Sequence, residues 1–113
     1  MLKDGVNCSW NDCDSSFVYS KHPRSAIART KDNRVLFVTA DGRFNDKAIG
    51  VSIPELSYLL KQMGAKDDIN LDGGGSAILW MKGNIINHPS DNMVFDNCGE
   101  RKVNNIICVL RNL

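Results

Sequence analysis

The chain has 113 residues, with 14 Lys or Arg against 13 Asp or Glu and a formal net charge of +1 at pH 7. A chain of this length holds one modest core, and its balanced charge excludes the broad basic surface that binds nucleic acid or anionic membranes. No apolar run approaches the roughly 20 residues that span a bilayer, and the first residues lack the apolar segment of a secretory signal. We therefore expect a cytoplasmic protein without nucleic-acid or membrane partners, or a secreted one if a signal has been removed.

The first half of the chain predicts a loop followed by a β-hairpin. Residues 1–20 are polar and rich in turn formers, which is typical of a loop-rich lead-in. Residues 26–30 and 34–40 are rich in β-branched and aromatic side chains, and the turn formers at 31–33 separate them. Two antiparallel strands joined by a tight turn are the expected result.

The clearest helix is expected at about residues 52–64. Ser52 and Glu55 have the spacing of a capping box, with an early proline between them. Apolar side chains then recur at helical spacing, and Gly64 is well placed to end the helix. This apolar face is expected to pack on the sheet.

The second half predicts more strands. Residues 76–81 form an apolar strand pattern, 82–84 a hairpin turn and 85–87 a returning strand. Residues 88–102 are polar and irregular, and residues 103–110 have the apolar pattern of a central strand. Strands with one inserted helix indicate an α+β fold with a mixed or largely antiparallel sheet.

Four cysteines, Cys8, Cys13, Cys98 and Cys108, form one pair near each end of the chain. They are thiols in a reducing cytosol and two disulfides in a secreted protein, and the sequence leaves both states open. Their spacing disfavours a structural zinc site, because only the first pair is close enough.

The most informative segment is the run of residues 70–76, Asn-Leu-Asp-Gly-Gly-Gly-Ser. Three glycines let the backbone turn sharply and expose N–H groups to an anionic or sugar-like ligand. Asp72 stands at the entrance of this loop, where it could accept a proton, bind a hydroxyl or ligate a metal. The alternative is an ordinary glycine-rich turn.

Six segments together resemble, in order and spacing, the phosphodiester glycosidase family: residues 22–27, 41–43, 50–56, 70–76, 87–91 and 99–101. The resemblance covers roughly residues 22–109 and corresponds to the C-terminal half of the family's domain. Nothing in the first 21 residues resembles the Asn-Gly-Gly-Phe-like stretch that members carry further upstream. We therefore expect residues 1–113 to be a single compact domain of this type that lacks the family's N-terminal portion.

The resemblance implies hydrolysis of a glycosyl phosphodiester, in which a sugar C1 is linked through oxygen to phosphate. Arg24 and Arg43 are the natural phosphate ligands, because a guanidinium forms paired hydrogen bonds with phosphate oxygens. The loop amides of residues 73–76 could supplement them. Asp72 is the first choice for the carboxylate at the anomeric carbon, and His22 could supply a proton near neutral pH.

The remaining candidates are substrate-binding residues: Ser25, Asp41, Arg43, Gly73, Gly74, Gly75, Ser76, Asp91, Glu100 and Arg101. Several have structural alternatives: His22 could order the loop before the strand, Arg24 could pair with Asp41 or Glu100, and Asp41 could form a turn. No cofactor is expected. A divalent cation held by Asp72, Asp91 and backbone oxygens is an open alternative, although no contiguous calcium loop is present.

Three functions therefore remain open from the sequence. The first is hydrolysis of a glycosyl phosphodiester. The second is sequestration of a sugar-phosphate or nucleotide-like small molecule without cleavage, by a homo-oligomer. The third is an inert fragment or structural module, which would behave poorly in solution because unpaired sheet edges and an incomplete core favour association.

Overall fold

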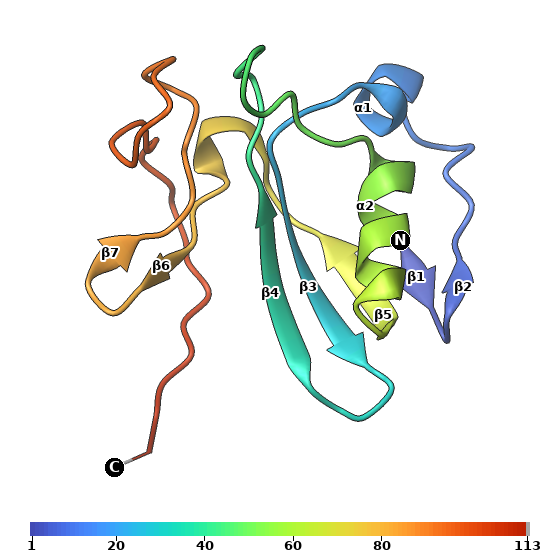
Figure 1. The fold of residues 1–113 in the computed structure, drawn as a ribbon. Helices are drawn as coiled ribbons and strands as arrows, with labels where there is room; N and C mark the ends of the chain where they lie inside the picture. Colours follow the sequence, from blue (N-terminus) through green and yellow to red (C-terminus); the bar gives the residue numbers. More distant parts are fainter. Residues whose placement is uncertain (113) are drawn as a thin grey trace.

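The computed structural model describes residues 1–112 and has an α+β fold, as the sequence predicts. A three-stranded antiparallel sheet of order β4–β3–β5 carries the main helix α2 on one face, and a loop-rich C-terminal region lies beside β4 (Figure 1). The elements in chain order are β1 (Leu2–Lys3), β2 (Val6–Asn7), α1 (Ser15–Tyr19), β3 (Arg24–Thr30), β4 (Val35–Ala40), α2 (Ile53–Gln62), β5 (Ala65–Asn70), the 3₁₀ turn η1 (Gly74–Ser76), β6 (Trp80–Met81) and β7 (Asn84–Ile85).

The central strand β3 sets the register of the sheet. Ala26 lies opposite Val38 of β4 and opposite Asn70 of β5. The β3–β4 hairpin turns where predicted, with Asn33 at a φ of 63°. Asparagine tolerates this left-handed conformation better than most residues. The paired strands deliver the end of β5 next to the start of β3, which is where the glycine loop begins.

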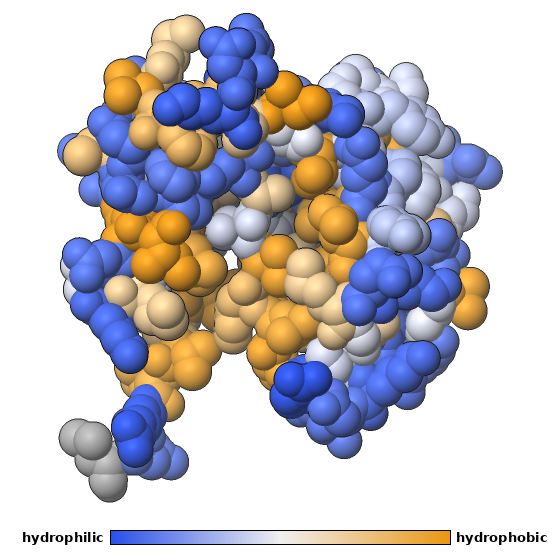
Figure 2. Space-filling view, viewed as in Figure 1, coloured by the Kyte–Doolittle hydropathy of each residue, from blue (hydrophilic) through white to orange (hydrophobic). Residues whose placement is uncertain are grey.

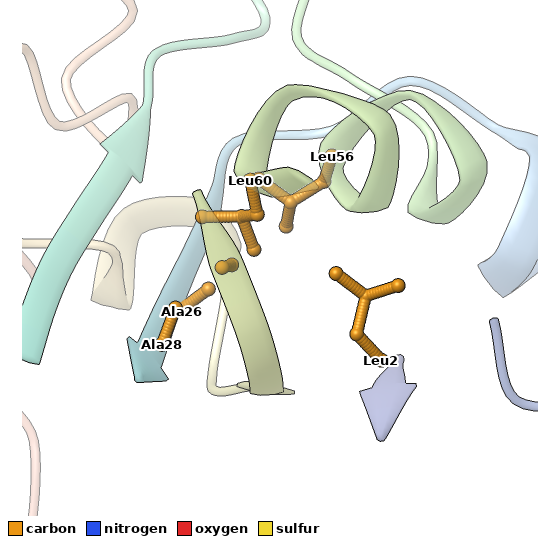
Figure 3. Packing of buried hydrophobic residues seen from close by; sticks show 6 residues of the cluster. Leu2, Ala26, Ala28, Leu56 and Leu60 are labelled. Carbon is orange, nitrogen blue, oxygen red and sulfur yellow. The ribbon is translucent and has the colours of Figure 1, made fainter. Parts of the chain in front are cut away.

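The core lies between the sheet and α2. Its buried cluster comprises Leu2, Ala26, Ala28, Leu56, Leu60 and Ala65 (Figure 3). Small alanines on β3 let the leucines of α2 lie directly against the strand, and Leu60 is fully buried. Ser52 and Glu55 form the predicted capping box, and Gly64 has a φ of 92° just past the helix.

The opposite face of the sheet is not covered by a helix. Ile27, Phe37 and Ile69 lie side by side across the three strands on this face. The side chains of Val35 and Ile69 are 58% and 59% exposed. The sheet therefore buries one apolar face and leaves the other accessible to solvent.

Four elements are missing from the sequence prediction. The short strands β1 and β2 and the helix α1 lie inside the expected loop of residues 1–20, and residues 65–70 form β5 although the run Ala-Lys-Asp-Asp-Ile-Asn is strongly polar. The aspartates of β5 are tolerated because they have partners. Asp67 pairs with Arg29, and Asp68 accepts the backbone N–H of Leu2.

The strands predicted in the second half are shorter than expected or absent. The 76–81 strand is reduced to β6, because Ser76 belongs to η1. The hairpin turn is confirmed at residues 82–83, and the returning strand is β7 at Asn84–Ile85 instead of residues 85–87. The predicted central strand at 103–110 is wrong: these residues have no secondary structure and are exposed. An apolar run forms a strand only when a neighbouring strand accepts its hydrogen bonds. Within residues 1–112, no helix is long and apolar enough to cross a membrane.

Candidate functional site

The glycine loop after β5 is closely packed at all three of its glycines. An added Cβ would lie 2.6 Å from the carbonyl oxygen of Pro23 at Gly73 and 3.1 Å from the Arg43 guanidinium at Gly74, and at Gly75 it would collide with the Asp91 carboxylate. The glycines therefore let two candidate side chains and the segment before β3 reach the loop backbone.

The loop does not form the open row of amides that the sequence predicts. The N–H of Gly73 donates to Oδ1 of Asp72, that of Gly74 to the carbonyl of Pro23, and that of Ser76 to the carbonyl of Gly73. Among the four amides of residues 73–76, only that of Gly75 has no protein acceptor in the described structure. The donors that this loop can offer to a ligand therefore come mainly from side chains.

Arg43 is one of those side chains. It follows the predicted Asp41-Gly42 turn with a φ of 64°, a left-handed conformation that costs energy for a residue with a Cβ. This backbone turns the exposed side chain so that its guanidinium lies against Gly74. The structure thus brings Arg43 and the glycine loop together, as predicted.

Arg101 approaches the loop from the other side. Its Nε and Nη2 donate to Oγ of Ser76 at 3.0 and 2.6 Å, and its backbone N–H donates to the carbonyl of Gly75. The carboxylate of Asp91 lies 4.0 Å from the same guanidinium. Both basic residues are exposed and come from distant segments, so two positive charges flank one loop.

Arg24 does not join this pair. Only 3% of Arg24 is exposed, and its guanidinium donates to the carbonyls of Val51, Phe17 and Ser20. These bonds tie α1 and the entrance of α2 to the start of β3. Arg24 therefore has a structural task, and its guanidinium does not pair with Asp41 or Glu100, the alternative that the sequence leaves open.

His22 lies at the same strand entrance, where its backbone pairs with that of Val51. Burial lowers the pKa of its imidazole, and the positive charges of Arg24 and Arg43 lower it further. The ring is consequently neutral at pH 7. A neutral imidazole accepts a proton, so this environment opposes the prediction that His22 supplies one.

A histidine outside the predicted set, His88, is bound to Asp41. Its backbone N–H donates to Oδ1 of Asp41 at 2.9 Å, and its Nδ1 lies 2.7 Å from Oδ2. The imidazole stacks on Phe95 at 3.9 Å between ring centres, and Phe95 contacts Phe44 edge to face. Asp41 thus orients the imidazole of His88. The signal was present in the sequence, because His88 belongs to the 87–91 segment of the resemblance.

The other predicted residues lie around the loop or away from it. Asp72 is exposed at the loop entrance, and Oγ of Ser25 donates to its backbone carbonyl. Glu100 instead lines an open hollow of about 600 Å³ together with the β6–β7 hairpin. Two buried oxygens, Oδ1 of Asn70 and Oγ of Ser90, have no partner in the described structure. Such groups normally have a partner, and a ligand hydroxyl or a water could provide it.

The described part of the chain contains no cluster of side chains that could bind a metal ion. Residues 1–112 contain no group of three or more His, Cys, Asp or Glu side chains placed to hold an ion. The four cysteines are exposed thiols.

Comparison with known proteins assigns this arrangement to a family. The model of the phosphodiester glycosidase family matches residues 1–110, so that the match includes the loop-rich lead-in as well as the six segments. The chain belongs to the phosphodiester glycosidase family. This finding confirms the resemblance and extends it to the first residue.

Relatives of this phosphodiester glycosidase chain are much longer. The mouse N-acetylglucosamine-1-phosphodiester alpha-N-acetylglucosaminidase is 32% identical over 97 residues, which are 84% of this chain and 18% of the mouse protein. A hypothetical protein from Synechocystis has a similar structure, with a TM-score of 0.63 and 28% identity over 76% of this chain and 16% of that protein. The catalytic domain of the zebrafish N-acetylglucosamine-1-phosphodiester alpha-N-acetylglucosaminidase shares the fold, with a TM-score of 0.66 and 23% identity over 79% of this chain and 32% of that domain.

Proposed function

We propose that the protein hydrolyses a glycosyl phosphodiester at the bond between the sugar C1 and the phosphate oxygen. The observation that carries this proposal is the convergence of Arg43 and Arg101 on the loop that begins with Asp72. Phosphate recognition needs cations, and glycoside cleavage needs a carboxylate. Family membership and the activity for which the mouse relative is named support the same substrate class.

Arg43 and Arg101 hold the phosphate in this proposal. Each guanidinium can donate paired hydrogen bonds to phosphate oxygens, and the N–H of Gly75 adds a donor between them. Arg24 does not contact the phosphate in this proposal. It stabilises the start of β3 through its hydrogen bonds to backbone carbonyls. Ser76 and Asp91 keep Arg101 in place.

The cleavage step uses Asp72 as the carboxylate that faces the developing positive charge on the sugar ring. Water adds to C1, the C1–O bond breaks, and the phosphate leaves as a monoester with the bonding electrons. Phosphate is a good leaving group, so the reaction depends little on a general acid. The proton released by water must go to a base.

Two imidazoles are candidates for that base. His22 is kept neutral by burial and by the nearby arginines. His88 has its Nδ1 engaged by Asp41, which leaves Nε2 as the acceptor when the ring is neutral. We expect activity to rise with pH through the lowered pKa of His22 if that ring is the base, because protonation below this pKa removes the acceptor.

Sugar release from a methyl phosphodiester of N-acetylglucosamine 1-phosphate tests the proposal. Asp72→Asn is expected to lower turnover by about 100-fold or more, since a positioned carboxylate contributes that much to such reactions. Asp12→Asn, an exposed aspartate in the lead-in, is the matched control and should keep the wild-type rate. Equal rates for Asp72→Asn and the wild type would refute the role of Asp72, and absence of sugar release by the wild type would refute hydrolysis.

Sequestration without cleavage is the second candidate, and the exposure of the site favours it. Asp72, Arg43, Asp91 and Arg101 are all accessible to solvent, whereas glycoside cleavage benefits from a site that excludes water. Incubation with uridine diphosphate N-acetylglucosamine, followed by heat release, separates the two functions. Intact nucleotide sugar recovered from the protein supports sequestration, and free sugar supports hydrolysis.

A further inference from the structure

The sheet ends at β4 with a free and unprotected edge. At the opposite edge of the sheet, residues near the N-terminus form hydrogen bonds with β5. The backbone N–H of Leu2 donates to the Asp68 carboxylate, and that of Gly5 donates to the carbonyl of Lys66. β4 pairs only with β3 in the described sheet. Its six residues contain no charge and no proline, which are the features that normally keep edge strands from pairing.

The backbone of β4 is ready to accept another strand. Thr30 donates its N–H to the carbonyl of Arg34, which fixes the alternation of the hairpin ladder. The N–H and C=O groups of Val35 and Phe37 therefore point away from β3, toward the free edge. The side chains of these two residues lie on the uncovered face of the sheet.

Residues 103–110 have the complementary properties. This segment of eight residues carries no charge, has the apolar pattern of a central strand and yet has no strand partner. Ile106, Val109 and Leu110 are 76%, 75% and 87% exposed. Burying such large apolar side chains is favourable, so their exposure favours association.

The chain keeps this segment away from its own β4. The last backbone hydrogen bond before it ties Arg101 to Gly75, and the segment then descends on the side of β6 and β7, apart from β4 (Figure 1). The space-filling view shows a hollow between the C-terminal region and the sheet, with apolar surface on both of its sides (Figure 2). The free edge of β4 is therefore open to a strand from another molecule, because residues 103–110 of the same molecule do not pair with it.

We propose that residues 103–110 of one copy add as a strand to the free edge of β4 in a second copy, and that the exchange is reciprocal. A two-fold dimer then pairs both free edges with the same interaction made twice. Each added strand extends the sheet by one strand beside β4 and lengthens the apolar row that Phe37 begins at this edge. The inference does not depend on the proposed hydrolysis.

Molar mass in solution, measured by light scattering over a range of protein concentrations, tests the exchange. The wild type should have twice the chain mass of 12.5 kDa. Ile107→Asp places a charge in the exchanged segment and should halve the mass without unfolding the protein, because this side chain is 60% exposed. Val6→Asp is the matched control, since Val6 is 68% exposed on β2, and it should stay dimeric.

A mixing experiment tests the partners of the exchange. Phe37→Pro removes one N–H from the free edge while the ladder with β3 is kept, and far-UV circular dichroism checks its fold. Each variant alone should be monomeric, and a mixture of Phe37→Pro with Ile107→Asp should form a heterodimer through the one intact segment and the one intact edge. A monomeric wild type, a dimeric Ile107→Asp, larger aggregates, or no heterodimer from two folded variants would overturn the proposal.

Discussion

The helix-and-sheet region and the C-terminal region of this molecule are stabilised in different ways. In the first, comprising β3, β4, α2 and β5, strand ladders and a buried leucine and alanine cluster fix each residue. In the second, residues 71–112, the backbone has few ladders and is fixed by individual contacts such as Arg101 to Ser76. Most candidate site residues lie in or against the second region. Changes in the first should therefore alter stability, and changes in the second should alter function.

Leu60→Ala is expected to have the largest effect on stability. Leu60 is fully buried between α2 and the sheet, and removing such a side chain costs about 2–5 kcal/mol of the free energy of unfolding. Leu59→Ala, on the same helix but 41% exposed, should cost clearly less. Urea titrations of both variants measure the difference, and equal losses would show that the cluster is not the stabilising core.

Gly75→Ala should separate function from stability in the C-terminal region. Its Cβ would collide with the Asp91 carboxylate, so either the loop or Asp91 must move. We expect a loss of about 1–3 kcal/mol from the overpacking and, in addition, weaker binding of a sugar phosphate. Gly83→Ala is the control. Its added Cβ meets open space, so its φ of 88° causes backbone strain without a steric collision. If Gly75→Ala binds the sugar phosphate with unchanged affinity, Asp91 does not contribute to the binding site.

Ser52→Ala tests the start of α2 and should have a smaller effect. The hydroxyl of Ser52 accepts the N–H of Glu55 at the first turn, and loss of such a cap costs about 1 kcal/mol. Thermal unfolding should show a modest decrease in Tm. Substrate affinity should not change, since the cap lies on α2 and not on the glycine loop.

The smallest effect concerns the pH dependence of stability. The Ser52 backbone N–H, followed by Lys21, lowers the pKa of Glu55 from 4.5 to about 2. As the pH falls, Glu55 therefore takes up its proton at a higher pH in the unfolded chain than in the folded one. The contribution of Glu55 to folding stability is present above pH 4.5 and is lost as the pH falls toward 2. Glu55→Gln should reduce this slope in acid unfolding curves. An unchanged slope would show that solvent screens the partly exposed pair.

Local sequence signals determined the parts of the fold that depend on nearby residues. The hairpin of β3 and β4, the capping box of α2 and the alternation of apolar residues all follow from spacing along the chain. The six segments also identified the family and most of the residues around the loop. Polar β5 could not be predicted, because its aspartates are tolerated only through partners far away in the sequence.

Tertiary structure decided how each chemical group is used. Only the folded chain shows that the guanidinium of Arg24 donates its hydrogen bonds to the carbonyls of Phe17, Ser20 and Val51. It also shows that Asp41 orients His88, and that most amides of the glycine loop have acceptors within the protein. It also decided that residues 103–110 remain unpaired, although their sequence favours a strand. Side-chain identity sets what a group can do, whereas hydrogen-bond partners and burial, which come from distant segments, determine which of those interactions it makes.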